Sequence, residues 1–234
     1  MLPTQILQNS ILLRLILLVI SVTYIETPNS IAQDTEDKTG IKLLVDTLQI
    51  YSEIFIVAQS YPGKNPQVNL FILNEDGDTV YKHPHIAGNG FSLQDFDKNG
   101  VLDIRMFQLS NVGGISELIC YDKSANEFIE VKGFENYPQP KQLGDSKIWY
   151  TYHSSGCADA NWGSELFVIE KFKLIELGDI IAGFCPRSDQ KGIRTFRIRD
   201  NTKERIHSFS EEPVNKHKFL KKYWKEHVEL FIVD

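Results

Sequence analysis

Carboxylate and carboxamide side chains recur at alternate positions in one short stretch of the chain. Asp95, Asp97, Asn99 and Asp103 occupy relative positions 1, 3, 5 and 9, and Gly100 occupies position 6. Hard cations prefer several oxygen ligands, and alternate residues of a tight loop can point such oxygens inward. Glycine at the sixth position permits a sharp turn because its φ angle can be positive. The stretch therefore predicts a calcium loop.

The loop is not an EF-hand, because an EF-hand loop closes with glutamate at position 12, where this chain has Met106. Its flanks favour strands over helices. The alternative is a metal-free, Asx-rich hairpin turn. Such a turn would not require Asp95 and Asp103 as well, and three neighbouring carboxylates repel unless a cation neutralises them. The expected cofactor is Ca²⁺, and its expected ligands are Asp95, Asp97, Asn99, Val101 (through its carbonyl) and Asp103.

Other reactive side chains are present, but none forms a recognisable catalytic set. The run from His153 to Asp159 contains a base, hydroxyls, a thiol and an acid, yet catalytic triads are assembled across a fold, so adjacency says little. His83 and His85 lack partners at zinc-ligand spacing and are expected in a loop. No phosphate loop, nucleophile elbow or dinucleotide fingerprint occurs. We expect no catalytic residues and no enzymatic activity.

The chain has three cysteines, Cys120, Cys157 and Cys185. In an exported chain this count suggests one pair and one unpaired thiol. Cys157 and Cys185 lie at the ends of an expected hairpin, whereas Cys120 lies within an apolar run and is expected to be buried. A Cys157–Cys185 disulfide would stabilise the fold by roughly 3–4 kcal/mol on the chain-entropy model.

The first 32 residues have the pattern of a signal peptide. An apolar run from Ile11 to Ile25 contains a compact core, Leu15–Val22, and Ser30 and Ala32 supply small residues at the −3 and −1 positions of a cleavage site. The apolar run is shorter than the ~20 residues of a membrane span. An uncleaved membrane anchor is the alternative. We expect a periplasmic or secreted protein.

The formal net charge of −6 is unevenly distributed along the chain. Residues 187–234 carry 12 Lys/Arg and 8 Asp/Glu, which leaves 13 and 23 for the rest of the chain. An acidic body argues against nucleic acid as a partner. The basic tail contains too many acids to be a polyanion-binding arm.

Strand-like segments and turn signals run through most of the chain. Ile41–Tyr51 and Ile54–Ala58 have strand-like patterns, and three hairpins are expected, with turns at residues 74–78, 122–126 and 171–173. Their spacing of roughly 45–50 residues is compatible with propeller-like blades. A sandwich of meanders remains the alternative. The predicted fold class is mainly β, with antiparallel hairpins in a propeller-like or sandwich domain.

One helix is expected near the end of the chain, over residues 216–231. Asn215 is placed to cap it, and apolar residues recur at helical spacing, which predicts an amphipathic helix packed on the β body. The predicted organisation is a signal peptide over 1–32, a disordered lead over 33–40, a calcium-binding β domain over 41–200, and a linker and C-terminal helix over 201–234.

The pattern Phe91…Asp95-x-Asp97-x-Asn99-Gly100-x-x-Asp103-Ile104, followed by Gly113-Gly114 and Tyr121-Asp122…Phe128, resembles a family of exported bacterial proteins. That family has a single calcium loop in a β-propeller-like domain, and it includes immunity proteins against lysozyme-like effectors of type IV secretion systems. The loop is also similar to the calcium loops of FG-GAP and VCBS repeats. The resemblance covers residues 91–177 and implies the same five ligands. The chain differs in lacking a lipoprotein cysteine and in adding the Cys157 loop and the C-terminal helix.

The working hypothesis is an exported, non-enzymatic, calcium-binding β domain that binds a protein or a glycan in the cell envelope. The resemblance implies a more specific role, inhibition of a lysozyme-like cell-wall hydrolase. A secreted glycan-acting hydrolase and an envelope structural module are the alternatives. Membrane association is expected only if the signal segment stays uncleaved.

Overall fold

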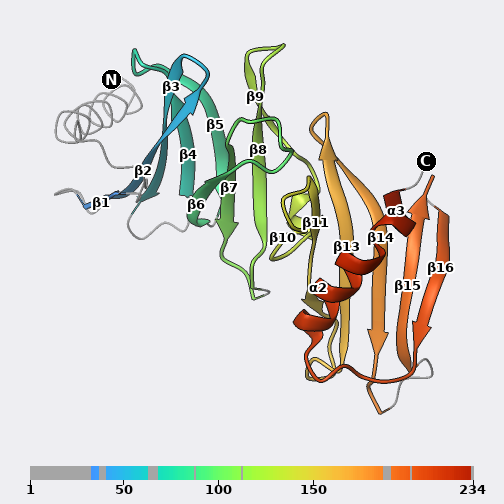
Figure 1. Cartoon of the computed structure of the whole chain (residues 1–234). Helices are drawn as coiled ribbons and strands as arrows, with labels where there is room; N and C mark the ends of the chain where they lie inside the picture. The colour runs from blue at the N-terminus through green and yellow to red at the C-terminus, as the bar shows by residue number, and fades with distance from the viewer. Residues whose placement is uncertain are drawn as a thin grey trace. The chain divides into compact units, whose positions relative to one another are not determined.

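The computed structural model describes residues 33–36, 41–62, 68–86, 88–111, 113–186, 191–200 and 202–232 (Figure 1). The predicted signal peptide lies outside these residues. The chain divides into two compact units, Met1–His85 and Ile86–Asp234. The predicted calcium loop and the C-terminal helix both belong to the second unit.

The first unit contains a five-stranded sheet with its strands in sequence order. The strands are β1 (Gln33–Glu36), β2 (Ile41–Ile50), β3 (Glu53–Pro62), β4 (Val68–Leu73) and β5 (Thr79–Ile86). The predicted Asp-Gly turn joins β4 to β5, with the Asn74 N–H donating to the Asp78 carbonyl at 3.0 Å and Gly77 at φ 83°. Val57 and Ile72, which pair with each other, are fully buried, and residues 55–60 of β3 are buried on both faces of the strand.

The second unit contains a four-stranded and a seven-stranded sheet. The four-stranded sheet has the order β6 (Gly88–Gln94), β7 (Asp103–Gln108), β8 (Ser116–Asp122) and β9 (Glu127–Glu130). A short 3₁₀ helix, η1 (Phe134–Asn136), follows. The seven-stranded sheet has the order β10 (Lys141–Gln142), β11 (Ile148–Tyr150), β13 (Asn161–Glu170), β14 (Lys173–Gly183), β15 (Gly192–Arg199) and β16 (Thr202–Phe209). Its remaining strand, β12 (His153–Ser154), pairs with β13.

Aromatic side chains fill a core shared by the two sheets of the second unit. Leu118 and Cys120 from β8 pack in one buried cluster with Trp149 from β11 and Phe167 from β13. Phe96, from the loop between β6 and β7, is fully buried in the same cluster. This arrangement places the predicted calcium loop directly beside the core of the unit.

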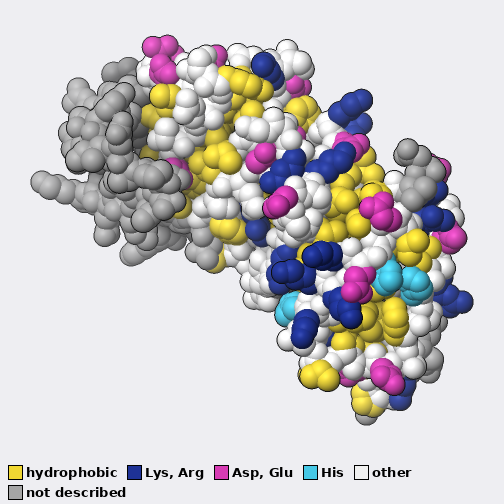
Figure 2. Space-filling model, viewed as in Figure 1, with side chains coloured by type: hydrophobic (Ala, Val, Ile, Leu, Met, Phe, Trp, Pro, Cys, Tyr) yellow, Lys and Arg dark blue, Asp and Glu magenta, His cyan; other side chains and the backbone are white. Residues whose placement is uncertain are grey.

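The C-terminal helix packs on the seven-stranded sheet, as predicted. Helix α2 (Lys216–His227) begins at Asn215, whose side chain accepts a hydrogen bond from the Lys218 N–H at 2.9 Å, and α3 (Glu229–Ile232) follows. The buried residues of α2 are Leu220, Tyr223 and Trp224, and they join a cluster with residues of β13, β14 and β15. Lys and Arg side chains gather over the outer face of α2 (Figure 2). The helix is therefore amphipathic in its packing.

The predicted fold class, mainly β with antiparallel hairpins and a C-terminal amphipathic helix, is confirmed. Sheets of five, four and seven strands differ from the repeated four-stranded blades of a propeller. In the second unit, residues of both sheets join one buried cluster, and the sandwich alternative stays a prediction.

The structure differs from the predicted domain boundaries at three places. Gln33–Glu36, in the predicted disordered lead, forms β1 and pairs with β2. Thr202–Phe209, in the predicted linker, forms β16, an edge strand. Charged side chains on an edge strand prevent further strand pairing. They also interrupt the apolar alternation by which a strand is predicted from sequence. The division at residue 85 also splits the predicted domain over 41–200.

Candidate metal centre

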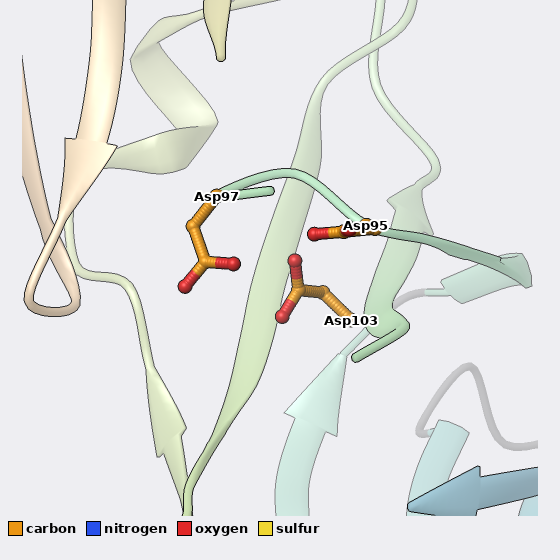
Figure 3. Close-up of side chains that lie close together, drawn as sticks. All are labelled: Asp95, Asp97 and Asp103. Carbon is orange, nitrogen blue, oxygen red and sulfur yellow. The ribbon is translucent and has the colours of Figure 1, made fainter. Parts of the chain in front are cut away.

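The structure brings three predicted ligands together. Asp95 and Asp97 lie in the loop after β6, and Asp103 is the first residue of β7. Each offers a carboxylate oxygen, and these three oxygens all lie within 4.8 Å of one another. The three carboxylates point toward a common space in Figure 3. Such a set of oxygens is typical of the ligands of a hard cation.

Local backbone hydrogen bonds hold the loop in its turn. The Gly100 N–H donates to Asp95 Oδ2 at 3.1 Å, and the Asn99 N–H donates to Asp97 Oδ1 at 3.1 Å. Gly100 has a φ of 86°, in the left-handed region that glycine adopts without steric cost. The role predicted for this glycine is therefore confirmed.

Two carboxylate oxygens in the cluster have no hydrogen-bond partner in the part of the chain that the structure describes. Oδ1 of Asp95 and Oδ1 of Asp103 are buried and accept no hydrogen bond from the described residues. Asp103 is only 1% exposed, and burial raises the pKa of its carboxyl to about 7, although hydrogen bonds from the Phe96 N–H and the Cys120 thiol act in the opposite direction. Burial also raises the pKa of Asp97, and the neighbouring Asp95 contributes to that rise. Buried, unpaired oxygens are costly, and a bound cation would satisfy them.

The two other predicted ligands, Asn99 and Val101, are engaged with the loop itself. Asn99 Oδ1 accepts a hydrogen bond from the Val101 N–H at 2.7 Å, and Asn99 Nδ2 donates to Asp97 Oδ2 at 3.0 Å. Asn99 is exposed, whereas Val101 is buried. Their participation as metal ligands stays a prediction.

Phe96, which the sequence did not single out, connects the carboxylates to the core. Its N–H donates to Asp103 Oδ2 at 2.7 Å, and its carbonyl accepts from Trp149 Nε1 at 2.8 Å. The Phe96 and Trp149 rings stack with their centroids 4.3 Å apart. A single aromatic residue between two aspartates of a polar loop was the available signal, but the sequence could not name its distant partner.

The contribution of Asp103 to stability is expected to fall as the pH rises in chelator-containing buffer. Its folded pKa of about 7 lies above the ordinary value of 3.8, so between about pH 4 and pH 7 the folded chain holds a proton that the unfolded chain releases. Each pH unit in this window costs up to about 1.4 kcal/mol. Urea unfolding at a series of pH values measures this slope. Asp103→Asn, which cannot titrate, should flatten it, and an unchanged slope in that variant would contradict the assignment.

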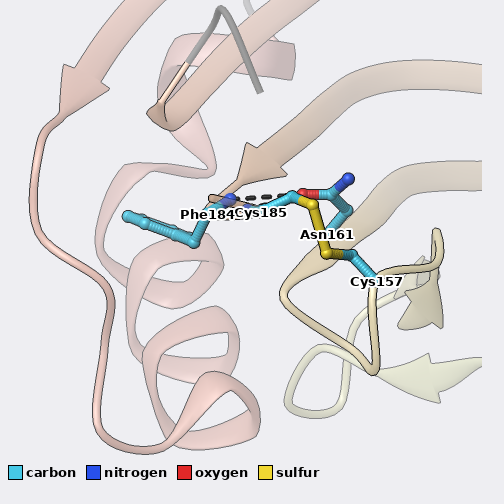
Figure 4. Close-up of a disulfide and its surroundings, with 4 residues drawn as sticks. All are labelled: Cys157, Asn161, Phe184 and Cys185. Carbon is cyan, nitrogen blue, oxygen red and sulfur yellow. Dashed lines mark hydrogen bonds between the residues drawn. A yellow bond between two sulfur atoms is a disulfide. The ribbon is translucent and has the colours of Figure 1, made fainter. Parts of the chain in front are cut away.

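In the run from His153 to Asp159, the base and the acid contact different partners, although the Ser154 hydroxyl hydrogen-bonds to Asp159. His153 Nδ1 lies 3.3 Å from Glu165 Oε1, while Asp159 accepts a hydrogen bond from Tyr152 and pairs with Lys216. Cys157 forms the predicted disulfide with Cys185, with a Cα–Cα distance of 5.9 Å (Figure 4). The thiol of this run is therefore not a free nucleophile.

The remaining sequence candidates have structural positions. Cys120 is free and buried, as predicted. His83 is buried within β5 rather than in the expected loop, and its Nδ1 lies 3.2 Å from the Tyr81 hydroxyl. The side chain of His85 lies outside the described residues.

Comparison with known proteins shows no family for this chain. No protein-family model matches the sequence, and no curated protein matches it. Among solved structures, the chain is similar to a structure described as a Xanthomonas type IV secretion system related protein. The identity is 9%, the TM-score is 0.43, and the match covers 78% of this chain and 96% of that one. A likeness of that size supports no transfer of function.

One observation bears on the compartment. The Cys157–Cys185 disulfide fits an exported protein, because disulfides persist in oxidising compartments outside the cytoplasm. In the part of the chain that the structure describes, no helix is long and apolar enough to cross a membrane.

Proposed function

We propose that this protein is an exported, non-enzymatic, calcium-binding β domain that binds a protein or a glycan in the cell envelope. The observation that supports it best is the convergence of the Asp95, Asp97 and Asp103 carboxylates, two of whose buried oxygens have no hydrogen-bond partner among the described residues. Inhibition of a lysozyme-like hydrolase is the specific form of the proposal, and it rests on the resemblance of the loop and its flanks. The disulfide of Cys157 supports a role without a cysteine nucleophile.

Calcium suits this donor set better than a softer metal. All the converging donors are carboxylate oxygens, whereas zinc sites draw mainly on histidine and cysteine. Ca²⁺ takes six to eight oxygens in flexible geometry, so the Val101 carbonyl, a reoriented Asn99 side chain and water would complete its coordination.

The ion's role in the proposal is structural. It would neutralise the repulsion among three carboxylates and stabilise the loop that places Phe96 against Trp149. A ligand that binds only the folded state stabilises that state by mass action. A calcium-loaded second unit would then present a rigid surface to its partner.

Calcium is expected to raise the melting temperature of the second unit. Extracellular calcium modules bind with Kd values of about 10⁻⁴–10⁻³ M, and a hundredfold excess over Kd adds about 2.7 kcal/mol. For a unit of this size that corresponds to roughly 5–10 °C. Thermal unfolding followed by tryptophan fluorescence reports this unit, because Trp149, Trp162 and Trp224 all belong to it.

Asp97→Ala should abolish the calcium-dependent shift. Asp145→Ala is the matched control, because it removes an exposed carboxylate of the same unit outside the cluster, and it should leave the shift intact. Equal melting temperatures of the unmutated protein in calcium and in chelator would refute the metal centre. Pulldown from periplasmic extract with and without calcium then tests the envelope partner.

A further inference from the structure

Strands β14 and β15 separate before either of them ends. Their pairing runs from Gly183–Gly192 to Gly178–Arg197, yet β14 extends back to Lys173 and β15 extends on to Arg199. A bulge in the β13–β14 pairing leaves Leu177 as the extra residue of β14 at this point. Bulges bend the strand that carries them. In Figure 1 the tip of the β13–β14 hairpin leans away from β15, with α3 near the opening.

A hollow of about 740 Å³ lies where the two strands separate. Tyr137 and Glu176 line it, as do Phe231 and Ile232 from α3. Two of its aliphatic side chains are well exposed for their type, Ile175 at 41% and Ile232 at 39%. Ile175 and Glu176 are neighbours on one strand, so they point to opposite faces of the sheet. The hollow is thus a gap between two strands.

Both sides of this gap are strand edges. On β14, residues 174–176 pair with β13 on one side, and the other side of this segment, including the bulged Leu177, faces the gap. On β15, Ile198 and Arg199 pair with β16 and likewise face the gap. The edge of a strand presents backbone N–H and C=O groups that can pair with an added strand. Recognition by strand addition takes its affinity from such groups.

The charge around Glu176 favours a cation. Burial raises the pKa of Glu176, and the nearby carboxylate of Asp179 raises it further, with a smaller contribution from Glu165. Lys203 and a hydrogen bond with the Tyr137 hydroxyl act in the opposite direction, but Lys203 is already paired with Asp179 at 2.6 Å and the hydroxyl is uncharged. On the β15 side the hollow is lined by Arg199 and Asp200, whose opposite charges add no net charge. A positive side chain beside Glu176 would therefore relieve the excess of negative charge.

We propose that the gap between β14 and β15 binds an extended peptide segment of a partner protein as an inserted strand. The segment would place aliphatic side chains against Ile175 and Ile232 and a lysine or arginine beside Glu176. This inference deepens the proposed function by specifying the partner, and it rests on that function only in taking the partner to be a protein.

A phage-displayed library of random dodecapeptides tests the inference. The library is selected on the full, unmutated protein, with soluble Ile175→Asp protein present in excess as competitor. The expected result is enrichment of peptides with alternating aliphatic residues and a lysine or arginine. In fluorescence anisotropy, Ile175→Asp should abolish binding of a labelled selected peptide. Glu176→Gln should weaken it about tenfold, equal to about 1.4 kcal/mol.

Leu109→Asp is the matched control, because Leu109 is an exposed aliphatic residue of the same unit outside the gap. It should bind the peptide like the unmutated protein. Hydrogen exchange should show new protection of the backbone amides of residues 174–177 and 198–199 when the peptide is bound. Peptides that protect other amides, or no enrichment over the competitor, would overturn the proposal.

Other occupants give different results. A second copy in the gap would appear in sedimentation velocity as a dimer that Ile175→Asp dissociates, and this would overturn the peptide proposal. Protection of the same amides by N-acetylglucosamine hexamer, but by no peptide, would do the same. All assays are run in calcium and in chelator. If calcium stabilises the protein but no peptide is selected, only this inference is overturned. If a peptide is selected but calcium does not stabilise the protein, only the metal centre is overturned.

Discussion

Trp224→Ala is expected to lower the free energy of unfolding of the second unit by about 3–5 kcal/mol, as truncation of a buried tryptophan does when it leaves a cavity. Trp224 is fully buried, and its Nε1 donates to Ser164 Oγ at 2.9 Å. Its ring also packs edge-to-face on Phe231 at a centroid distance of 5.1 Å. The substitution therefore removes a buried contact between α2 and the seven-stranded sheet.

Urea unfolding followed by the fluorescence of Trp149 and Trp162 measures this loss. Lys225→Ala is the matched control, because Lys225 is the next residue of α2 and is exposed, and surface substitutions usually stay within about 0.5 kcal/mol. Trp224→Phe keeps most of the apolar contact but loses the hydrogen bond to Ser164, so its loss should be intermediate. Equal stability of the Trp224→Ala and Lys225→Ala proteins would show that the helix does not depend on this packing.

The double substitution Cys157→Ser/Cys185→Ser is expected to cost roughly 3–4 kcal/mol, because the disulfide closes a 28-residue separation. The loop that the disulfide restrains contains three consecutive non-glycine residues with positive φ angles. Cys157, Ala158 and Asp159 have φ angles of 56°, 50° and 68°, and such left-handed conformations persist where the surrounding structure over-determines them. Asn161 adds to the restraint, since its Oδ1 accepts the backbone N–H of Phe184 and of Cys185 at 3.2 Å each (Figure 4).

Reductant provides the control for the disulfide. Dithiothreitol should lower the melting temperature of the unmutated protein toward that of the double variant, and it should leave the double variant unchanged. Cys120 is buried and has no disulfide partner, so reductant should not act through it. A double variant as stable as the oxidised protein would show that Asn161 and its hydrogen bonds hold the loop without the disulfide.

Features that depend on a few consecutive residues were predictable. The alternation of Asp95, Asp97 and Asn99 and the position of Gly100 specify a turn whose acidic side chains converge, because side-chain direction in a short loop is set by local φ and ψ. The three hairpin turns and the Asn215 cap were predicted for the same reason. Each is satisfied by neighbours in the chain.

Tertiary structure decided the features that depend on distant residues. Phe96 contacts Trp149, which lies 53 residues further along the chain. This contact forms in the buried cluster that the two sheets of the second unit share. The charged edge strand β16 forms because β15 offers it a template. The gap between β14 and β15 depends on a bulge and on where α3 packs, and no local pattern specifies either of these. The sequence by itself determined the acidic loop, the hairpins and the capped helix. The fold decided which buried groups meet, because contacts between distant segments are selected by the packing of the whole core.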